Sequence, residues 1–380
     1  MNNICKYLMK KTILINFEFV MYSIQPFAFI SGKNIKFSFF TALRKFIHKV
    51  SLPLAYAMFV GVTMIVSTQF VKASKKQKVD NDVKKVVFVA GERSHGYGAH
   101  EHRAGCMLLA KLIEENTNNI ITKVYSEGWP ENEDAFEGAD AIVLFSDGGP
   151  KHMVIPHLES LNKYMERGVG LGIIHYAVVV PPGKAGNYFL DWIGGFFETD
   201  WSVNPFWTAK FENIPRNEVT KGVNSFEIYD EWYYHMRFID DIDKIQPILS
   251  ALPPESTLTR EDGPYSNNSY VREAVKERKE PQHVMWLFER TKMPGRSFGH
   301  TGGHYHWEWG NPDFRTVTLN AIMWIAGMEI PKNGISTPVL TIEDLLVNQD
   351  YEQPDNFDLN EIKKQLKEWQ AGHKYNKAVR

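Results

Sequence analysis

The sequence predicts an α/β fold in which a doubly wound, mostly parallel sheet carries helices on both faces. Several short apolar runs have the length and composition of buried strands: 86–90, 122–125, 141–145 and 170–174. Residues 104–115 and 157–166 lie between these runs and carry apolar side chains at helical spacing. Because parallel strands are joined by right-handed crossovers, this alternation predicts strands that are buried on both sides.

The composition is that of an ordinary globular protein. Of 380 residues, 43% are hydrophobic and 23% are charged, which is enough apolar material for a sizeable core. The net charge of -2 provides no basic field for a nucleic-acid backbone, so we expect no nucleic-acid partner. Cys5 and Cys106 are too few for a disulfide framework or a Cys-rich zinc module. Any metal site must therefore use histidines and carboxylates.

Residues 1–73 are expected to be a leader. Its uncharged core, 51–71, follows several basic residues, and Val71-Lys72-Ala73 has the small residues that a signal peptidase reads. The same run is long enough to cross a bilayer, so two interpretations stay open: a signal peptide cleaved after Ala73, or an uncleaved anchor. Both place the main domain in the periplasm or outside the cell. We expect contact with the membrane only through this segment.

The folded domain is expected over 84–331. Residues 74–83 are rich in Lys and Asp, which cannot be buried unpaired, so this stretch is predicted to be a solvated linker. After the domain the chain is polar, with one predicted helix at 359–370. Residues 332–380 are therefore expected to be an appended C-terminal tail.

Histidines gather in the loops that follow the predicted strands. In a doubly wound sheet the ligand crevice lies beyond the carboxyl ends of the strands. The loops at this edge contain His95, His100, His102 and His175. Neutral imidazole binds metals or acts as a general base near pH 7, although each ring could instead be a polar loop residue that pairs with its neighbours. No Ser or Cys occupies the turn at His175, and Cys106 falls on the apolar stripe of a helix, which excludes a cysteine nucleophile.

Two later segments, 230–235 (DEWYYH) and 299–309 (GHTGGHYHWEW), combine histidines, carboxylates and aromatic rings. This mixture suits a sugar, because hydroxyls need charged acceptors while the C–H face of the sugar stacks on a ring. The candidate sugar-binding residues are Tyr176, Trp201, Trp232, Tyr233 and Trp307. The alternative for each tryptophan is a place in the core. If 302–308 is extended, His304, His306 and Glu308 share one face.

The chain resembles the ThuA-like family, named for trehalose utilisation, over roughly 84–331. The resemblance depends on the order and spacing of five motifs: SHGYGAHEHRAG, GVGLGIIHYA, LDWIGGFFETDWSVNP, DEWYYHMRF and GHTGGHYHWEWGNPDFRTVTLNAIMWIAG. It implies a flavodoxin-like fold related to the class I glutamine amidotransferase domain, without the amidotransferase nucleophile. It also implies a role on trehalose-like or 3-keto-glycoside intermediates. His300 is a local departure for which the resemblance supplies no role.

We therefore expect a sugar-active enzyme that isomerises, eliminates from or hydrolyses a keto-glycoside. The candidate catalytic residues are His175, Glu231 and Asp230, with one of the carboxylates moving a proton alpha to a carbonyl. His95, His175 and His304 are the candidate ligands of a divalent metal, zinc or similar. The expected partner is a small sugar or keto-sugar. The alternatives are a carbohydrate-binding module or pseudoenzyme, which would bind sugar without turnover, and a scaffold for another protein.

Overall fold

A computed structural model describes residues 83–373. The predicted leader, its cleavage site at Ala73 and the linker up to residue 82 lie outside the described residues. Within the described part of the chain, no helix combines the length and apolarity required to span a bilayer.

Seven strands form one mixed sheet in the order β2-β1-β3-β4-β11-β10-β9. Their bounds are β1 (Lys84–Ala90), β2 (Ile120–Tyr125), β3 (Ala141–Phe145), β4 (Gly170–Ile174), β9 (Ile245–Ala251), β10 (Gln282–Glu289) and β11 (Arg296–His300). The first five strands of this order are parallel, whereas β10 is antiparallel to both of its neighbours. The predicted α/β fold with a mostly parallel sheet is confirmed.

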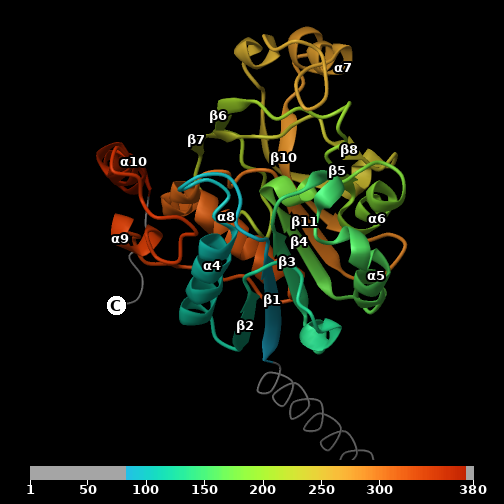
Figure 1. Ribbon diagram of the computed structural model, residues 1–380, viewed down its shortest axis with the longest axis vertical. Helices are drawn as coiled ribbons and strands as arrows, with labels where there is room; N and C mark the ends of the chain where they lie inside the picture. The colour runs from blue at the N-terminus through green and yellow to red at the C-terminus, as the bar shows by residue number, and fades with distance from the viewer. Residues whose placement is uncertain (1–82, 374–380) are drawn as a thin grey trace, which may run out of the picture. The chain divides into compact units, whose positions relative to one another are not determined.

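Helices cover both faces of the sheet (Figure 1). α4 (His102–Asn116) and α8 (Pro312–Ile325) pack on one face, and α5 (Leu158–Glu166) and α6 (Lys184–Ile193) pack on the other. Along β3, alternate residues enter the two separate cores, and all five are buried. This double burial explains why the central strands are continuous apolar runs rather than alternating ones.

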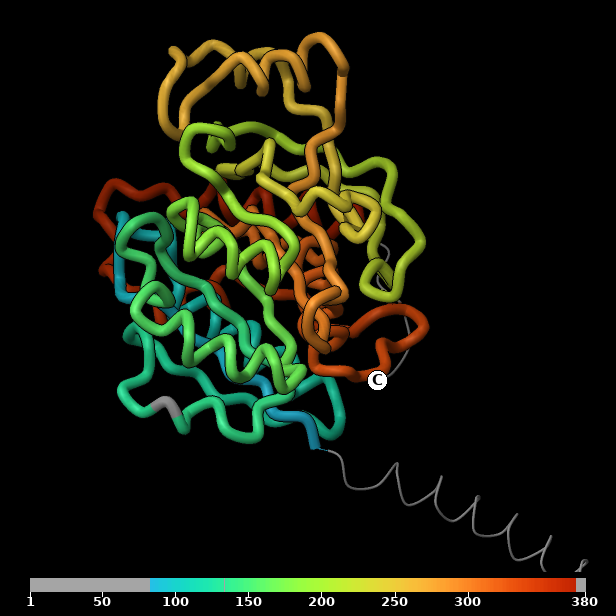
Figure 2. Tube along the Cα trace, turned by 90° about the vertical axis from the view of Figure 1, so that its right-hand side faces the viewer, coloured from blue at the N-terminus to red at the C-terminus, as the bar shows by residue number. Residues whose placement is uncertain are grey.

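A smaller layer lies over the carboxyl ends of the parallel strands, at the top of the domain in Figures 1 and 2. It contains the antiparallel pairs β6 (Phe206–Phe211) with β7 (Phe226–Glu231) and β5 (Gly195–Phe196) with β8 (Arg237–Phe238), and the short α7 (Ser269–Arg272). β6 alternates strictly between exposed and buried residues. The hairpin β6–β7 therefore covers the domain with one face and presents the other to solvent.

The segment expected to be an appended tail packs against the domain over its described part. It contains α9 (Ile342–Leu345) and α10 (Leu359–Gly372), whose Leu345 and Leu366 are buried in the core under α8. The guanidinium of Arg315 on α8 is fully buried and donates to Trp309 O, Thr337 Oγ1 and Pro338 O. A few apolar residues, spaced for one helix face, are enough to attach this otherwise polar segment.

Candidate metal centre

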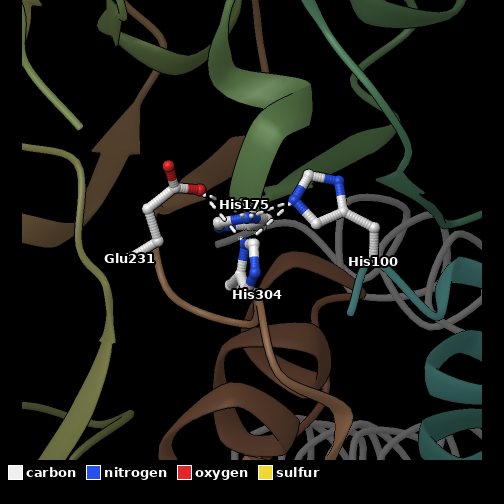
Figure 3. A group of neighbouring side chains, drawn as sticks. All are labelled: His100, His175, Glu231 and His304. Atoms are coloured by element: carbon white, nitrogen blue, oxygen red, sulfur yellow. Dashed lines mark hydrogen bonds and ion pairs between the residues drawn. The ribbon is translucent and has the colours of Figure 1, made fainter. Parts of the chain in front are cut away.

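Four side chains converge at the carboxyl edge of the sheet: His100, His175, Glu231 and His304 (Figure 3). His100 precedes α4, and His175 is the first residue after β4. Glu231 ends β7, and His304 lies in the loop after β11. Because neighbouring parallel strands end at one edge and β7 lies over that edge, residues far apart in the sequence meet there. One ligand atom from each residue lies within 4.8 Å of all the others.

The spacing of these atoms matches a shell around one small cation. His100 Nε2 lies 3.1 Å from both His175 Nε2 and His304 Nδ1. Glu231 Oε2 lies 3.1 Å from His304 Nδ1 and 3.7 Å from His175 Nε2. Ligands that bind zinc at about 2.0–2.1 Å in a tetrahedral shell are separated from one another by about 3.4 Å. The four residues therefore have the donor types and the separations of a three-histidine, one-carboxylate site.

The outer hydrogen bonds of two rings fix their tautomers. His175 Nδ1 donates to Thr301 O over 2.8 Å, and a carbonyl oxygen can only accept. His100 Nδ1 donates to Asp147 Oδ1, also over 2.8 Å. In a neutral ring this leaves Nε2 without a proton, and the Nε2 atoms of both rings face into the cluster. Two lone pairs that face each other at 3.1 Å repel unless a cation or a proton lies between them.

Burial keeps these rings uncharged. It lowers the pKa of His175 well below its usual value, and the neighbouring imidazoles of His100 and His304 lower it further. The pKa of His100 is also lowered by burial and by the rings around it. A proton is therefore a poor substitute for the missing positive charge, whereas neutral imidazole is the form that binds a metal.

Two tyrosines form one wall of the centre. Tyr233 Oη lies 3.3 Å from His175 Nε2 and 3.2 Å from Glu231 Oε2, and burial raises the pKa of this phenol well above its usual value. Tyr176 is half-buried, its ring centroid lies 5.8 Å from that of His100, and burial raises its pKa to about 12. Both phenols keep their protons at neutral pH and can donate hydrogen bonds to a bound molecule.

A model of one protein family, described as trehalose utilisation, matches residues 85–325. The chain belongs to the ThuA family. A ThuA-like protein from Bacteroides uniformis is 15% identical, with 65% of this chain and 92% of that chain covered at a TM-score of 0.47. One from Parabacteroides merdae is 17% identical, with 70% of this chain and 99% of that chain covered at a TM-score of 0.45. No curated protein matches the chain.

His95, a predicted ligand of this ThuA protein, lies outside the four. Its side chain is 42% exposed and stacks on His100, with the two ring centroids 3.6 Å apart. His100 joins His175 and His304 in the group of four, and His95 belongs to a second group, with His100 and Asp147, whose ligand atoms also lie within 4.8 Å of one another. His95, His100 and His175 all have positive φ, a strained conformation for residues with a Cβ, so this backbone conformation is shared by rings inside and outside the group of four. His175 and His304 occupy the places that the sequence predicted for them.

Asp230, a predicted catalytic residue, is completely buried and has a structural role. Its Oδ2 accepts from Gly303 N over 2.6 Å, and its Oδ1 accepts from Glu231 N over 2.7 Å. Glu308 adjoins it, and burial beside Asp230 raises the pKa of Glu308 well above its usual value. Asp230 therefore holds the loop that carries His304, whereas the neighbouring Glu231 points the opposite way along β7, into the centre.

Residues 302–308 are not extended, so the condition under which His304, His306 and Glu308 would share one face is not met. Gly303 adopts a φ of 109°, and residues His306–Gly310 form a 3-10 turn, which places His306 and Glu308 in the interior. An extended run would put three side chains on one face, but this turn leaves only His304 at the centre. A glycine in a left-handed conformation interrupts the strand geometry on which the expectation depended.

The three predicted tryptophans do not contact the side chains of the four residues at the centre. Trp232 is fully buried and donates to Ile228 O. Trp307 is buried against Tyr97 and Phe357. Trp201 stacks on His235 and lines a separate cavity of about 440 Å³. Of the predicted sugar-binding residues, only Tyr176 and Tyr233 lie at the centre.

Sequence reasoning missed the residues that orient Glu231. Asn204 Nδ2 donates to Glu231 Oε1 over 2.9 Å, and Arg260 Nη1 donates to Asn204 Oδ1 over 3.1 Å. These bonds engage Oε1 and leave Oε2 facing the histidines. Asn204 and Arg260 come from the irregular layer above the sheet, where no periodicity marks them. Asp147, the partner of His100, also went unassigned, although it follows β3 at the predicted edge.

Proposed function

We propose that this ThuA protein is a metal-dependent enzyme that acts on a keto-glycoside or a related sugar, and that His100, His175, Glu231 and His304 hold one divalent ion, zinc or similar. One observation carries the proposal. The Nε2 atoms of His100 and His175 face each other at 3.1 Å, and the Nδ1 atom of each ring already donates a hydrogen bond elsewhere. A divalent ion is the partner that satisfies both lone pairs and the carboxylate together. When bound, such an ion supplies Lewis-acid polarisation of a sugar carbonyl or hydroxyl.

The chain's own residues supply orientation and proton transfer. Tyr233 keeps its proton and donates to Glu231 Oε2 or to a substrate oxygen that enters beside it. His95 and Asp147 are the titratable groups on the solvent side, with side chains 42% and 38% exposed and their nearest atoms 3.8 Å apart. Removal of a proton alpha to a carbonyl, as isomerisation or elimination requires, falls to this pair. The proposal gives Asp230 no part in this proton transfer, because its carboxylate oxygens accept from the backbone N–H groups of Gly303 and Glu231.

Export remains part of the proposal. The apolar run 51–71 is the feature that supports a periplasmic or extracellular location, with or without an anchor. Fractionation of cells that express the full chain tests this location. Retention of the full-length chain in the cytosol would contradict it.

The test of function combines metal analysis with turnover. We expect about one equivalent of divalent metal in the purified protein, and loss of most of it in His175→Ala and His304→Ala. His283→Gln, a histidine on β10 bonded to Ser250 Oγ, is the matched control and should keep its metal. A screen of 3-keto-glycosides should give product with the wild-type protein, and a chelator should abolish product formation until metal is restored.

Two results would count against the proposed metal-dependent enzyme, each in a different way. Full activity in His175→Ala, with no metal in the wild-type protein, ends the metal-dependent mechanism. Saturable sugar binding without product from any 3-keto-glycoside favours the alternative, a carbohydrate-binding module or pseudoenzyme.

A further inference from the structure

A segment near the end of the described chain lies against the loop that carries His100. We call this segment, residues 348–357, the strap. It lies beyond residues 85–325, which the ThuA family model matches, and the proposed function gives it no role. α9 precedes the strap and α10 follows it, and Leu345 and Leu366 of these helices are buried in the core. The strap is therefore held in place at both ends.

The first contact of the strap is with Arg103, in the first turn of α4. The guanidinium donates from Nε to Asn348 O and from Nη2 to Gln349 O, each over 3.1 Å. It also pairs with Asp350, whose Oδ1 lies 3.3 Å from Nε. Because a guanidinium presents several donors in one rigid plane, this single side chain binds three consecutive residues of the strap.

The second contact is with Glu101, the residue between His100 and His102. Glu101 is almost completely buried, and its carboxylate accepts two backbone hydrogen bonds. Oε1 accepts from Gly98 N over 3.0 Å, and Oε2 accepts from Asp350 N over 2.7 Å. The first bond closes a turn of the loop around His100, and the second bond attaches this turn to the strap.

Aromatic rings hold the far end of the strap. Phe357 packs edge-on against Tyr97, with ring centroids 4.8 Å apart, and against Trp307 at 5.7 Å. Tyr97 belongs to the loop of His100, and Trp307 belongs to the turn that follows His304. The backbones of the two loops are also joined, because His100 N donates to His304 O over 2.8 Å. The strap therefore contacts both loops that carry these proposed ligands.

His100 requires such support because its backbone is strained. Its φ of 51° is unfavourable for a residue with a Cβ, and such a conformation persists only where the surrounding structure holds it. Gly98 and Glu101, which the carboxylate joins, lie on either side of this residue. A loop released from the strap can relax to an ordinary backbone conformation, which changes the direction of the His100 side chain.

We propose that the strap is a positioning element of the metal centre, which holds the loop in the conformation that directs His100 Nε2 toward His175 and His304. This inference rests on the proposed function and extends it to a segment outside the matched residues. Among the described residues, no hydrogen bond joins the strap to a side chain of the four proposed ligands. The strap therefore acts on a bound ion only through the loop.

The test is a zinc competition titration of the purified full chain and its variants. Arg103→Ala removes the donors to the strap, and Glu101→Gln replaces one acceptor oxygen with an amide nitrogen that cannot accept. We expect each variant to keep the fold and to bind zinc about 10- to 100-fold more weakly, the range typical for the loss of an outer-shell partner. Arg290→Ala is the matched control, because Arg290 also donates to two backbone carbonyls, Pro294 O and Val169 O, at the opposite edge of the sheet.

Amide hydrogen exchange of the metal-free protein provides a readout that does not depend on the ion. Peptides from the loop 91–101 should exchange faster in Arg103→Ala and Glu101→Gln than in the wild-type protein, and at the wild-type rate in Arg290→Ala. Faster exchange spread equally over the whole domain would assign the strap to general stability and overturn the inference.

Two results of the titration would also overturn it: a zinc affinity within threefold of wild type in both strap variants, or an equal loss of affinity in Arg290→Ala. If the wild-type protein binds zinc and the strap variants match it, the inference fails and the proposed function stands. If the wild-type protein binds no zinc and turns over no 3-keto-glycoside, the proposed function fails and the inference fails with it.

Discussion

Asn204 offers the most direct test of how the centre is assembled. Its side chain connects Arg260 to Glu231 and touches none of the three histidines through a hydrogen bond. Asn204→Ala removes the donor that engages Glu231 Oε1 and the acceptor that receives Arg260 Nη1. The carboxylate then loses the bond that turns Oε2 toward His175 and His304, while all four proposed ligands remain in the chain.

The size of the effect follows from known outer-shell substitutions. Loss of a hydrogen-bond partner of a metal ligand typically weakens metal affinity about 10- to 100-fold, equal to about 1.4–2.8 kcal/mol. Asn204→Asp should lower the metal affinity more than Asn204→Ala does. It preserves the acceptor for Arg260 but places a second negative charge against Glu231, where like charges repel.

The assay is a competition titration of zinc between the protein and a chromogenic chelator. Asn162→Ala is the matched control, because Asn162 also connects a donor to a carboxylate: it accepts from Trp192 Nε1 and donates to Glu166 Oε1, on α5. We expect zinc affinity to fall in the Asn204 variants and to stay at the wild-type value in Asn162→Ala. An affinity within threefold of wild type in Asn204→Ala, with the fold retained, would refute the assigned role.

Two further predictions concern stability. His152 is buried, accepts from Val154 N and donates to Ala177 O, and burial lowers its pKa from 6.5 to about 4. Because the unfolded chain takes up a proton first as the pH falls, this ring's contribution is complete above pH 6.5 and is lost toward pH 4, a change of about 3 kcal/mol. Denaturant titrations at several pH values should show a shallower loss in His152→Asn, whose amide oxygen can still accept from Val154 N, and an unchanged slope would contradict the assignment. Leu366→Ala, in α10, should lower the free energy of unfolding by about 2–4 kcal/mol, whereas exposed Lys367→Ala should change it by less than about 0.5 kcal/mol. Equal stability of both variants in thermal and denaturant unfolding would show that the C-terminal segment does not support the core.

The strands and the position of His175 were predictable because each depends on local sequence. A strand buried on both faces must be apolar at every position, and the residue that follows such a strand must lie at the carboxyl edge of the sheet. β3 and β4 match the predicted runs residue for residue, and His175 follows β4 directly. Cys106 is buried in α4, where burial raises the pKa of its thiol, in agreement with its predicted place on the apolar stripe.

The sequence does not determine which of two nearby side chains points toward the centre. Asp230 and Glu231 are adjacent in β7, so their side chains point to opposite faces, and the sequence does not say which face is the centre. His95 and His100 share one loop and the same left-handed backbone conformation, so only the contacts of each ring with distant segments separate the buried His100 from the exposed His95. The sequence left the environment of the tryptophans open for a similar reason, because an indole fits both a buried core and a sugar-binding surface.

By itself, the sequence determined the α/β fold, the edge at which the histidines gather and the place of Cys106 on the apolar stripe of a helix, since these follow from periodicity and residue type. The tertiary structure alone decided that His100 joins His175, Glu231 and His304, that Asn204 and Arg260 orient the carboxylate, and that residues 348–357 pack against the loop of His100. The physical reason is that a ligand shell is set by side-chain directions and by contacts between distant segments. Both are fixed only when the hairpin and the loops pack together over the ends of the parallel strands.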